Sequence, residues 1–326
     1  MEGKIRRRFF SLTMIVPAVT TLIGLATGAY AAPLTVGLSM PDLSESFWTS
    51  LAYGVDDEAK KLGVTIVKLN AGGDANVNQQ ISQLQDMSQR HVDAMIVGAT
   101  SDVAVRPVVE QILGAKIPVI GLSSLPNTPK LTAAVTADHY AMGKLQAECL
   151  GKAIDGNGEV GMMAGPAGQT WSDLRANGFR DTIKAQFPNI KIATESRLAD
   201  NRNAALTTTE DWVQRFTDLK GIYSATDDIG AGVVDALKAA NKFGQIKVST
   251  SNFSPTAQKM LASGEFVCTA IQQIVLQGRV ALQQAVKAAK GEPVEAKIST
   301  PALLVTKDNM STINLSDVTA PAGYRP

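Results

Sequence analysis

The stretch "DAMIVGATSDVAVRPVVEQILGAKIPVIGL", residues 93–122, decides the fold of this chain. It starts and ends with short apolar runs, 93–99 and 117–122, and the apolar positions between them recur with the period of a helix. Short continuous apolar runs are typical of strands buried in a parallel sheet, where a helix must cross from each strand to the next. The stretch therefore predicts a strand–helix–strand unit.

The same alternation continues along most of the chain. Helical patterns separate the apolar runs, for example at 47–63 and 76–90. This pattern is typical of doubly wound parallel sheets, and ten strands over this length favour two α/β lobes with a core each. The predicted strands are 34–40, 64–70, 93–99, 117–122, 131–137, 159–165, 190–196, 221–226, 246–251 and 266–271.

Residue types at the ends of the helical patterns predict where helices begin and end. Asn76 and Asp102 each precede a pattern and are expected to cap it, whereas Gly63 stands where the first one should end. Pro107 falls inside its window and predicts a kink or a late start there.

The first 31 residues predict a cleaved secretory signal peptide. Basic residues at 4–8 precede an apolar stretch, and Ala29 and Ala31 form an Ala-x-Ala site. We expect cleavage after Ala31 and export to the periplasm, while Pro17 and Gly24 disfavour the alternative of a membrane anchor. The arginine run is also similar to a twin-arginine signal, so the export route stays open.

The charge of the exported chain excludes one class of partner. The signal peptide carries four of the 31 basic residues and one of the 30 acidic ones, so its removal leaves a net charge of −2. A nearly neutral chain has no electrostatic reason to bind nucleic acid.

The chain has two cysteines, Cys149 and Cys268. Cys149 falls in a helical pattern and Cys268 in a strand pattern, so we expect two small buried hydrophobic residues. A bridge between them in an oxidising compartment is the alternative.

No motif in the chain requires catalysis, a cofactor or a metal. The "GNGEVG" at 156–161 has the letters of a nucleotide-binding loop but precedes a strand, so it predicts a turn. His91 and His139 are too few for an ordinary zinc site. Asp227 and Asp228 are a possible general-base pair, but they serve equally well as hydroxyl acceptors and as negative charges at a helix start. We therefore expect no enzyme.

Polar and aromatic residues follow most of the predicted strands in both halves. Ligands of open parallel sheets bind at the carboxyl ends of the strands, and flat rings with carboxylates, amides and an arginine suit a small polyhydroxylated solute. The candidates are Asp42, Glu45, Phe47, Trp48, Asp74, Ser123 and Ser124 in the first half, and Trp171, Arg175, Thr226, Asp227, Asn252, Phe253 and Gln272 in the second.

With these features the chain resembles the type I periplasmic solute-binding proteins of the ribose-binding class. The stretch quoted first carries the resemblance, together with "SESFWTSLAYGVDDEAKKLG", "GPAGQTWSDLRANGF", "SATDDIGAGVVDALKAA" and "TAIQQIVLQG". The resemblance implies two Rossmann-like doubly wound lobes with a three-strand hinge, closing over a ligand. Lobe 1 would hold 32–137 and 273–300, and lobe 2 would hold 138–272 and 301–326.

The resemblance also implies roles for individual residues. Phe47 and Trp48 match a ring pair that sandwiches the ligand, although one ring in the core is the alternative. Ser123 and Ser124 stand where ribose binders have an Asp-Arg pair, which disfavours ribose itself. The remaining matches are Arg175 with the second-lobe arginine, Thr226 in place of an asparagine, Asp227 with the acid beside it, Asn252 in place of an aspartate, and Gln272 with the hinge glutamine.

Within that class the chain looks most similar to the trimethylamine-N-oxide-sensing (TorT-like) branch, through "LNAGGDANVNQQ", "MAGPAG", "IQQIVLQG" and "TAPAGYRP". Where that branch has further cage aromatics, this chain has Asp74 and His139, so His139 is a further candidate ligand-binding residue. Fewer rings weaken the case for a methylated amine, so a sugar or polyol is favoured.

The resemblance implies a binding protein that captures a small polar ligand for an ABC-type importer. The alternative is a sensory binding protein that docks on the ectodomain of a membrane histidine kinase. Both would act by lobe closure, and we expect a monomer.

Overall fold

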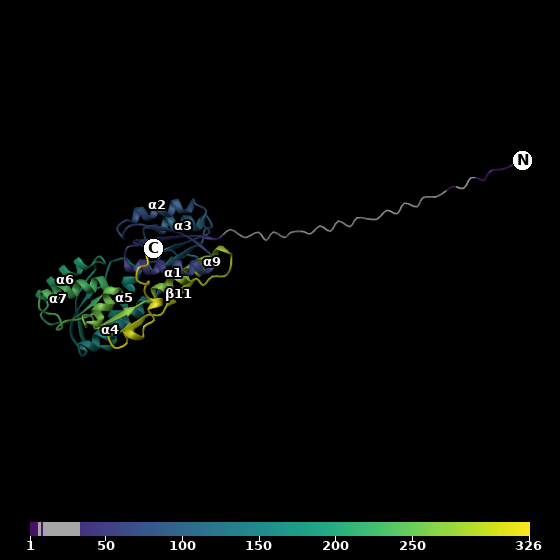
Figure 1. Ribbon diagram of the computed structural model, residues 1–326. Coiled ribbons are helices and arrows are strands. Elements are labelled where there is room, and N and C mark those ends of the chain that lie inside the picture. Colours follow the sequence, from purple (N-terminus) through teal and green to yellow (C-terminus); the bar gives the residue numbers. More distant parts are fainter. Residues whose placement is uncertain (6–7, 9–32) are drawn as a thin grey trace. The chain divides into compact units, whose positions relative to one another are not determined.

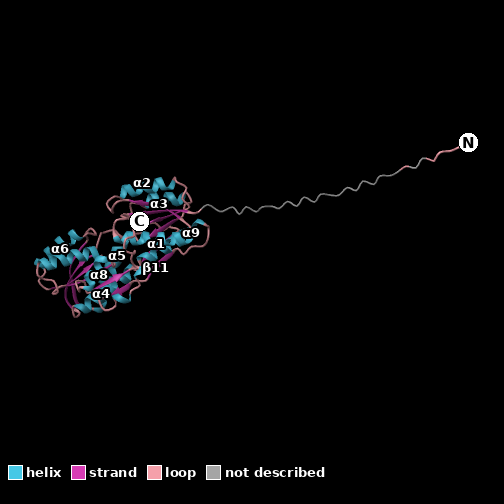
Figure 2. Ribbon diagram, in the orientation of Figure 1, coloured by secondary structure: helices cyan, strands magenta, loops and turns pink. Residues whose placement is uncertain are grey.

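The computed structural model of the chain describes residues 1–5, 8 and 33–326, so the predicted signal peptide lies almost entirely outside the described residues. Residues 33–326 form one compact unit with two six-stranded sheets (Figures 1 and 2). Helices cover both faces of each sheet, and the prediction of two α/β lobes is confirmed. No helix among the described residues is long and apolar enough to cross a membrane.

The first sheet has the strand order β11-β5-β4-β3-β1-β2, and its neighbouring strands run parallel. Helices α1 (Ser46–Leu62) and α9 (Ile274–Ala289) pack on one face, and α2 (Val77–Ser88) and α3 (Arg106–Gly114) on the other. The strands are β1 (Thr35–Met40), β2 (Thr65–Asn70), β3 (Ala94–Val97), β4 (Val119–Leu122), β5 (Ala133–Ala137) and β11 (Lys297–Thr300).

The second sheet has the order β12-β10-β9-β8-β6-β7, in which β12 runs antiparallel to β10 and the other neighbours run parallel. Its helices are α4 (His139–Ala153), which packs against α5 (Thr170–Gln186), α6 (Arg202–Arg215), which packs against α7 (Asp227–Ala239), and α8 (Pro255–Ala262). The strands are β6 (Asn157–Met163), β7 (Asn189–Ser196), β8 (Leu219–Ser224), β9 (Lys247–Ser251), β10 (Cys268–Ile271) and β12 (Leu303–Val305).

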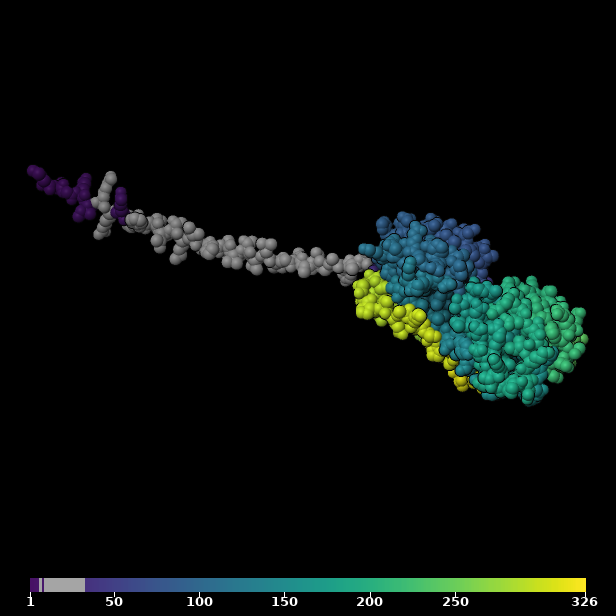
Figure 3. Space-filling view, turned by 180° about the vertical axis from the view of Figure 1, so that it is seen from behind, coloured from purple at the N-terminus to yellow at the C-terminus, as the bar shows by residue number. Residues whose placement is uncertain are grey.

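The chain crosses between the two sheets three times, which forms the expected three-strand hinge. The crossings lie between β5 and α4, between β10 and α9, and between β11 and β12. The amide of Asp138 in the first crossing donates to the carbonyl of Thr300 in the third, at 3.1 Å. In Figure 3 the yellow carboxyl-terminal part runs along the surface beside both lobes.

One predicted helix end is confirmed and two predicted caps are wrong. Gly63 ends α1 in the left-handed region, at φ 67°. The side chain of Asn76 donates to the carbonyls of Ala71 and Gly72 and caps nothing. Helix α3 begins only at Arg106, after a late start, so Asp102 lies too far upstream to cap it.

The expectation that the cysteines are separate is wrong, because Cys149 and Cys268 form a disulfide with their Cα atoms 6.6 Å apart. Helix α4 packs across β9 and β10, and this packing brings its Cys149 against the start of β10. The two positions are 119 residues apart in sequence, and only the tertiary packing of α4 makes them neighbours.

The carboxyl-terminal tail packs on the helices of the first sheet. Arg279 of α9 pairs with Asp317 at 2.8 Å, and the amide of Ala320 donates to the Ser50 hydroxyl of α1. The predicted lobe boundaries stay a prediction, and we propose one change to them. Residues 301–305 belong with lobe 2 through β12, whereas the tail from about residue 314 belongs with lobe 1.

Glycine pairs let the main helices of each lobe cross in close contact. In the first lobe Gly54 of α1 and Gly278 of α9 face the backbone of the opposite helix, and in the second lobe Gly178 of α5 and Gly143 of α4 do the same. A Cβ atom at any of these positions would overlap a carbonyl oxygen of the neighbouring helix.

Candidate functional site

A pocket lies between the two lobes at the carboxyl ends of their strands. It holds about 920 Å³ of empty space, including the part that is open to solvent. Of the predicted site residues it is lined by Glu45, Phe47, Trp48, Asp74, Ser123, Ser124, His139, Trp171, Arg175, Thr226, Asp227, Asn252, Phe253 and Gln272.

The predicted residue that does not line the pocket is Asp42. Its carboxylate accepts hydrogen bonds from the backbone amide and the hydroxyl of Ser44, at 2.9 and 2.7 Å, and so shapes the loop before α1. Asp228, named from the sequence beside Asp227 as a possible hydroxyl acceptor, lines the pocket as well. The sequence analysis missed further lining residues: Ser46, Ser50, Pro166, Gln169, Asp200, Ser254, Ile274, Val318 and Thr319.

Asp200 could have been found from the sequence. It follows β7, and the rule that selected the other candidates, a polar residue past the carboxyl end of a strand, applies equally there. Val318 and Thr319 carry no such signal, because they reach the pocket only through the packing of the tail on lobe 1.

The ring pair occupies the wall contributed by lobe 1. The rings of Phe47 and Trp48 meet edge to face, with centroids 5.0 Å apart and an interplanar angle of 85°. Trp48 is only 6% exposed, packs in the lobe 1 core and lies against Gly98, whereas Phe47 is half-buried. Trp48 therefore packs in the core and lines the pocket at once, and its contact with a ligand stays a prediction.

Arg175 lies opposite, in the wall contributed by lobe 2. It is 2% exposed, and its Nη1 donates to the carbonyl of Ala225 at 2.7 Å. Its Nε donates to Nδ1 of His139 at 3.3 Å and its Nη2 to Oδ1 of Asn252 at 3.4 Å, while the Trp171 ring stacks 5.0 Å from the guanidinium carbon. These bonds use three of the five N–H groups and leave two for a ligand.

His139 is neutral in this setting. Burial and the charge of Arg175 hold the pKa of His139 well below its usual range. Since Nδ1 accepts from Arg175, the ring proton lies on Nε2, which donates to the Thr136 hydroxyl at 3.0 Å. Arg175 keeps its charge at neutral pH, because burial lowers its pKa only to about 10.

Amide side chains extend the Arg175 network into the hinge. Gln277 donates to Gln272, and Gln272 donates to Oδ1 of Asn252, each at 3.0 Å. Asn252 has a positive φ of 70°, a conformation that asparagine tolerates better than most residues. The lobe 2 wall is therefore held in place by protein contacts alone.

The pocket also carries several carboxylates with raised pKa values. Burial raises the pKa of Asp227 to about 6. Burial, and then the negative charges of its acidic neighbours Asp228, Asp227 and Glu45, raise the pKa of Asp200 to about 7. The hydrogen bond that Asp200 accepts from Thr226 opposes this rise. The side chain of Asp200 is accessible from the pocket, so water screens part of this rise, whereas Asp227 is buried.

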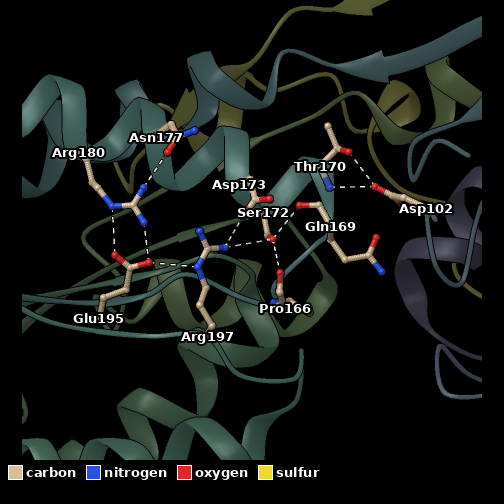
Figure 4. Close-up of polar contacts among 10 residues, drawn as sticks. All are labelled: Asp102, Pro166, Gln169, Thr170, Ser172, Asp173, Asn177, Arg180, Glu195 and Arg197. Atoms are coloured by element: carbon tan, nitrogen blue, oxygen red, sulfur yellow. Dashed lines mark hydrogen bonds and ion pairs between the residues drawn. The ribbon is translucent and has the colours of Figure 1, made fainter. Parts of the chain in front are cut away.

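A direct contact joins the two lobes at the rim of the pocket (Figure 4). Oδ2 of Asp102, in lobe 1, accepts from the amide and the hydroxyl of Thr170 at 2.9 and 2.8 Å. Thr170 is the first residue of α5, so Asp102 caps a helix of the other lobe. Beside it the Gln169 amide donates to the carbonyl of Thr100 at 3.2 Å.

The start of α5 is also anchored within lobe 2. Figure 4 shows Arg197 between Asp173 and Glu195, at 2.9 and 3.1 Å, and Arg180 in a two-pronged contact with Glu195. The Ser172 hydroxyl donates to the backbone carbonyls of Pro166 and Gln169. These contacts fix the turn from which Trp171 and Arg175 reach the pocket.

Comparisons with known proteins agree with this geometry. A family model described as a periplasmic binding protein domain matches residues 36–293. The ribose import binding protein of Haemophilus influenzae is 30% identical over 291 residues, which cover 88% of this chain and 96% of the relative. The xylitol-binding protein of Mycolicibacterium smegmatis is 27% identical over 285 residues, and this alignment covers 87% of this chain and 80% of the relative.

A solved structure has the same fold. The carbohydrate transporter solute binding protein of Agrobacterium radiobacter, solved in complex with D-arabinose, superposes with a TM-score of 0.83 at 24% identity. The match covers 89% of this chain and 99% of that structure.

Proposed function

The chain belongs to the periplasmic binding protein family, and we propose that it captures a small polyhydroxylated solute, a sugar or a polyol, for an ABC-type importer. One observation carries the proposal: the pocket between the lobes places a ring pair opposite a fixed set of hydrogen-bonding side chains. Relatives named for binding ribose and xylitol support the same ligand class.

Binding would use the two walls differently. A ring face covers the apolar C–H surface of a sugar, while carboxylates and amides accept and donate hydrogen bonds at its hydroxyls. A ligand that touches both walls favours the closed arrangement of the lobes. The prediction that the chain is not an enzyme is confirmed, because the family and the relatives it matches are binding proteins.

The finer expectations belong to this proposal as well. We propose cleavage after Ala31 and export to the periplasm, which amino-terminal sequencing of the exported chain would test. The TorT-like resemblance and a sensory role at a histidine kinase rest on four short stretches, and the names of the relatives favour import. Genes for a permease and an ATPase beside this gene would support import, whereas a hybrid kinase gene would support sensing.

A thermal-shift screen tests the proposed function. The chain from residue 32 is heated with a panel of sugars and polyols, and a ligand that binds the native state alone raises the melting temperature. At about 100 times the Kd the gain is about 2.7 kcal/mol. The proposal fails if no sugar, polyol or amine-bearing relative of these shifts the melting temperature.

A further inference from the structure

The pocket wall carries an excess of negative charge. Arg175 is the one lysine or arginine among the described lining residues, and His139 is neutral. With all carboxylates ionised, five acids against one arginine give the wall a charge of −4. The acids are Glu45 and Asp74 from lobe 1, and Asp200, Asp227 and Asp228 from lobe 2.

Protein cations do not pair directly with these five carboxylates, although Arg175 lies within electrostatic range of Asp200 and Asp227, and Arg202 within range of Asp228. Ion pairs join many acids elsewhere on the described residues to lysine or arginine, for example Asp235 to Arg202 and Glu265 to Lys238. None of the five lining acids takes part in an ion pair among residues 33–326. Arg175 donates to neutral acceptors only.

The carboxylates also have unused capacity to accept hydrogen bonds. Glu45, Asp74 and Asp228 receive no hydrogen bond from a side chain or backbone group of the described part of the chain. Asp227 is only 7% exposed, lines the pocket, and accepts from the Ser254 amide at 2.8 Å through its Oδ2. A carboxylate has more acceptor positions than this contact uses, so a donor in the pocket can bind it as well.

The acids of the two lobes also repel one another across the pocket. Glu45 is exposed to solvent from the pocket side, and partial burial, then the charges of Asp74 and Asp42 from its own lobe, and last that of Asp228 raise its pKa to about 7, an effect that water partly screens. Asp228 belongs to lobe 2 and Glu45 to lobe 1, so these two carboxylates repel each other across the pocket. A positive charge between them would relieve this repulsion.

The geometry favours an organic cation over a metal ion. Within the described ranges no three histidine, cysteine or acidic side chains lie close enough together to hold a metal. The acids instead line the pocket between the lobes, together with the rings of Phe47 and Trp48. Aromatic faces attract ammonium groups, and spaced carboxylates suit a cation whose N–H and O–H donors point in several directions.

We infer that the pocket prefers a sugar or polyol that bears a protonated amine to the neutral molecule of the same shape. The ammonium group lies between Glu45 of lobe 1 and Asp228 of lobe 2, and the hydroxyls bind the remaining carboxylates, Asn252 and Arg175. This inference rests on the proposed function, since it specifies the ligand class of the same pocket.

Calorimetric titration of matched ligands tests the inference. The probes are D-glucosamine against D-glucose and Tris against pentaerythritol, two pairs in which an ammonium group replaces a hydroxyl or hydroxymethyl group, with N-acetyl-D-glucosamine as an uncharged derivative of the amine. We expect the amines to bind at least about tenfold more tightly than their neutral partners, because charge-assisted hydrogen bonds are about twice as strong as neutral ones.

Two double variants assign the effect to the named acids. Glu45→Gln with Asp228→Asn should bring the amine-to-neutral affinity ratio close to one, and neither change breaks a protein hydrogen bond. Glu210→Gln with Asp218→Asn removes the same charge from exposed positions outside the pocket and should keep the ratio.

The outcomes separate the inference from the function beneath it. Neutral molecules that bind as tightly as their amines overturn the inference and leave the proposed function standing. An amine preference that survives in the Glu45 and Asp228 variant overturns the assignment to these acids. If none of these probes binds while a neutral sugar or polyol of the thermal-shift panel does, the inference alone fails; if nothing in either panel binds, the proposed function fails and the inference fails with it.

Discussion

The two walls of the pocket are built in opposite ways. In lobe 2, Arg175, Asn252 and Gln272 hold one another in place before any ligand arrives. In lobe 1, Glu45 and Asp74 have no protein hydrogen-bond partner among the described residues, and Phe47 is half-buried. A fixed group loses little entropy when it binds, so we expect the ligand to gain most of its orientation from lobe 2 and to order lobe 1 as the pocket closes.

Removal of the disulfide should give the largest difference in stability between the two lobes. The double variant Cys149→Ala, Cys268→Ala removes a disulfide whose two cysteines are 119 residues apart. The chain-entropy model predicts that removing a disulfide around such a loop lowers the free energy of unfolding by about 5 kcal/mol. Chemical unfolding measures the loss, and hydrogen exchange locates it. Lost protection should concentrate in α4, β9 and β10 and spare α1 and α9. Equal loss in both lobes would remove the contrast.

Replacing the rings tests the lobe 1 wall. Trp48→Ala should lower the free energy of unfolding by about 3–5 kcal/mol and weaken ligand binding, because the ring fills the core and lines the pocket. Phe47→Ala is the matched change at the half-buried neighbour and should cost less stability, about 1–2 kcal/mol. Unchanged melting and unchanged affinity in Trp48→Ala would exclude the proposed role of this wall.

Arg175→Gln tests the lobe 2 wall. We expect about hundredfold weaker binding, or about 2.7 kcal/mol, because the guanidinium and the network it orients are lost. The stability should change by less than about 2 kcal/mol, since the lost hydrogen bonds are offset by removal of a buried charge. Arg215→Gln, which breaks an exposed ion pair with Asp211 on α6, is the control and should leave affinity unchanged.

The pH dependence of stability should reflect the pocket acids with raised pKa values, among which Asp227 is the one with a buried side chain. Asp227 has a pKa of about 6 in the folded chain against an ordinary 3.8, so between these values the folded state holds a proton that the unfolded state releases. Stability is therefore lost as the pH rises from about 4 to about 6, by up to about 3 kcal/mol in the ligand-free protein, and this effect of Asp227 is level above that range. Unfolding curves between about pH 4 and pH 7 measure this change.

Asp227→Asn is the control for the pH effect. The asparagine Oδ1 can still accept from the Ser254 amide, so the backbone contact survives while the titrating group is removed. The slope with pH should flatten in this variant. A wild-type protein that becomes more stable as the pH rises over the same range would contradict the prediction.

Local patterns predicted the framework of this fold well. Each of the ten apolar runs contains or overlaps an observed strand, because buried parallel strands need continuous apolar residues. The two strands that were not predicted, β11 and β12, are short, lie at the sheet edges and flank Pro301 in the hinge. Their residues are partly exposed, so they lack the apolar run that identifies a buried strand.

One rule, that ligands bind at the carboxyl ends of parallel strands, predicted much of the pocket lining from the sequence. Polar residues past the carboxyl ends of strands converge because the strands are parallel, and that rule selected Asp74, Thr226 and Gln272 correctly as lining residues. It cannot foresee contacts that packing creates between distant segments. Three features depend on such packing: the cap that Asp102 forms on α5, the disulfide between Cys149 and Cys268, and the position of Val318 at the pocket.

The glycine crossings have a consequence for the origin of the whole molecule. Gly54 and Gly178 are each the ninth residue of their helices, α1 and α5, and Gly278 and Gly143 are each the fifth residue of α9 and α4. Phe47 and Trp171 are likewise both second residues. Such matched positions are what a duplicated ancestral half-chain would leave, with one copy later specialised for aromatic contact and the other for a guanidinium.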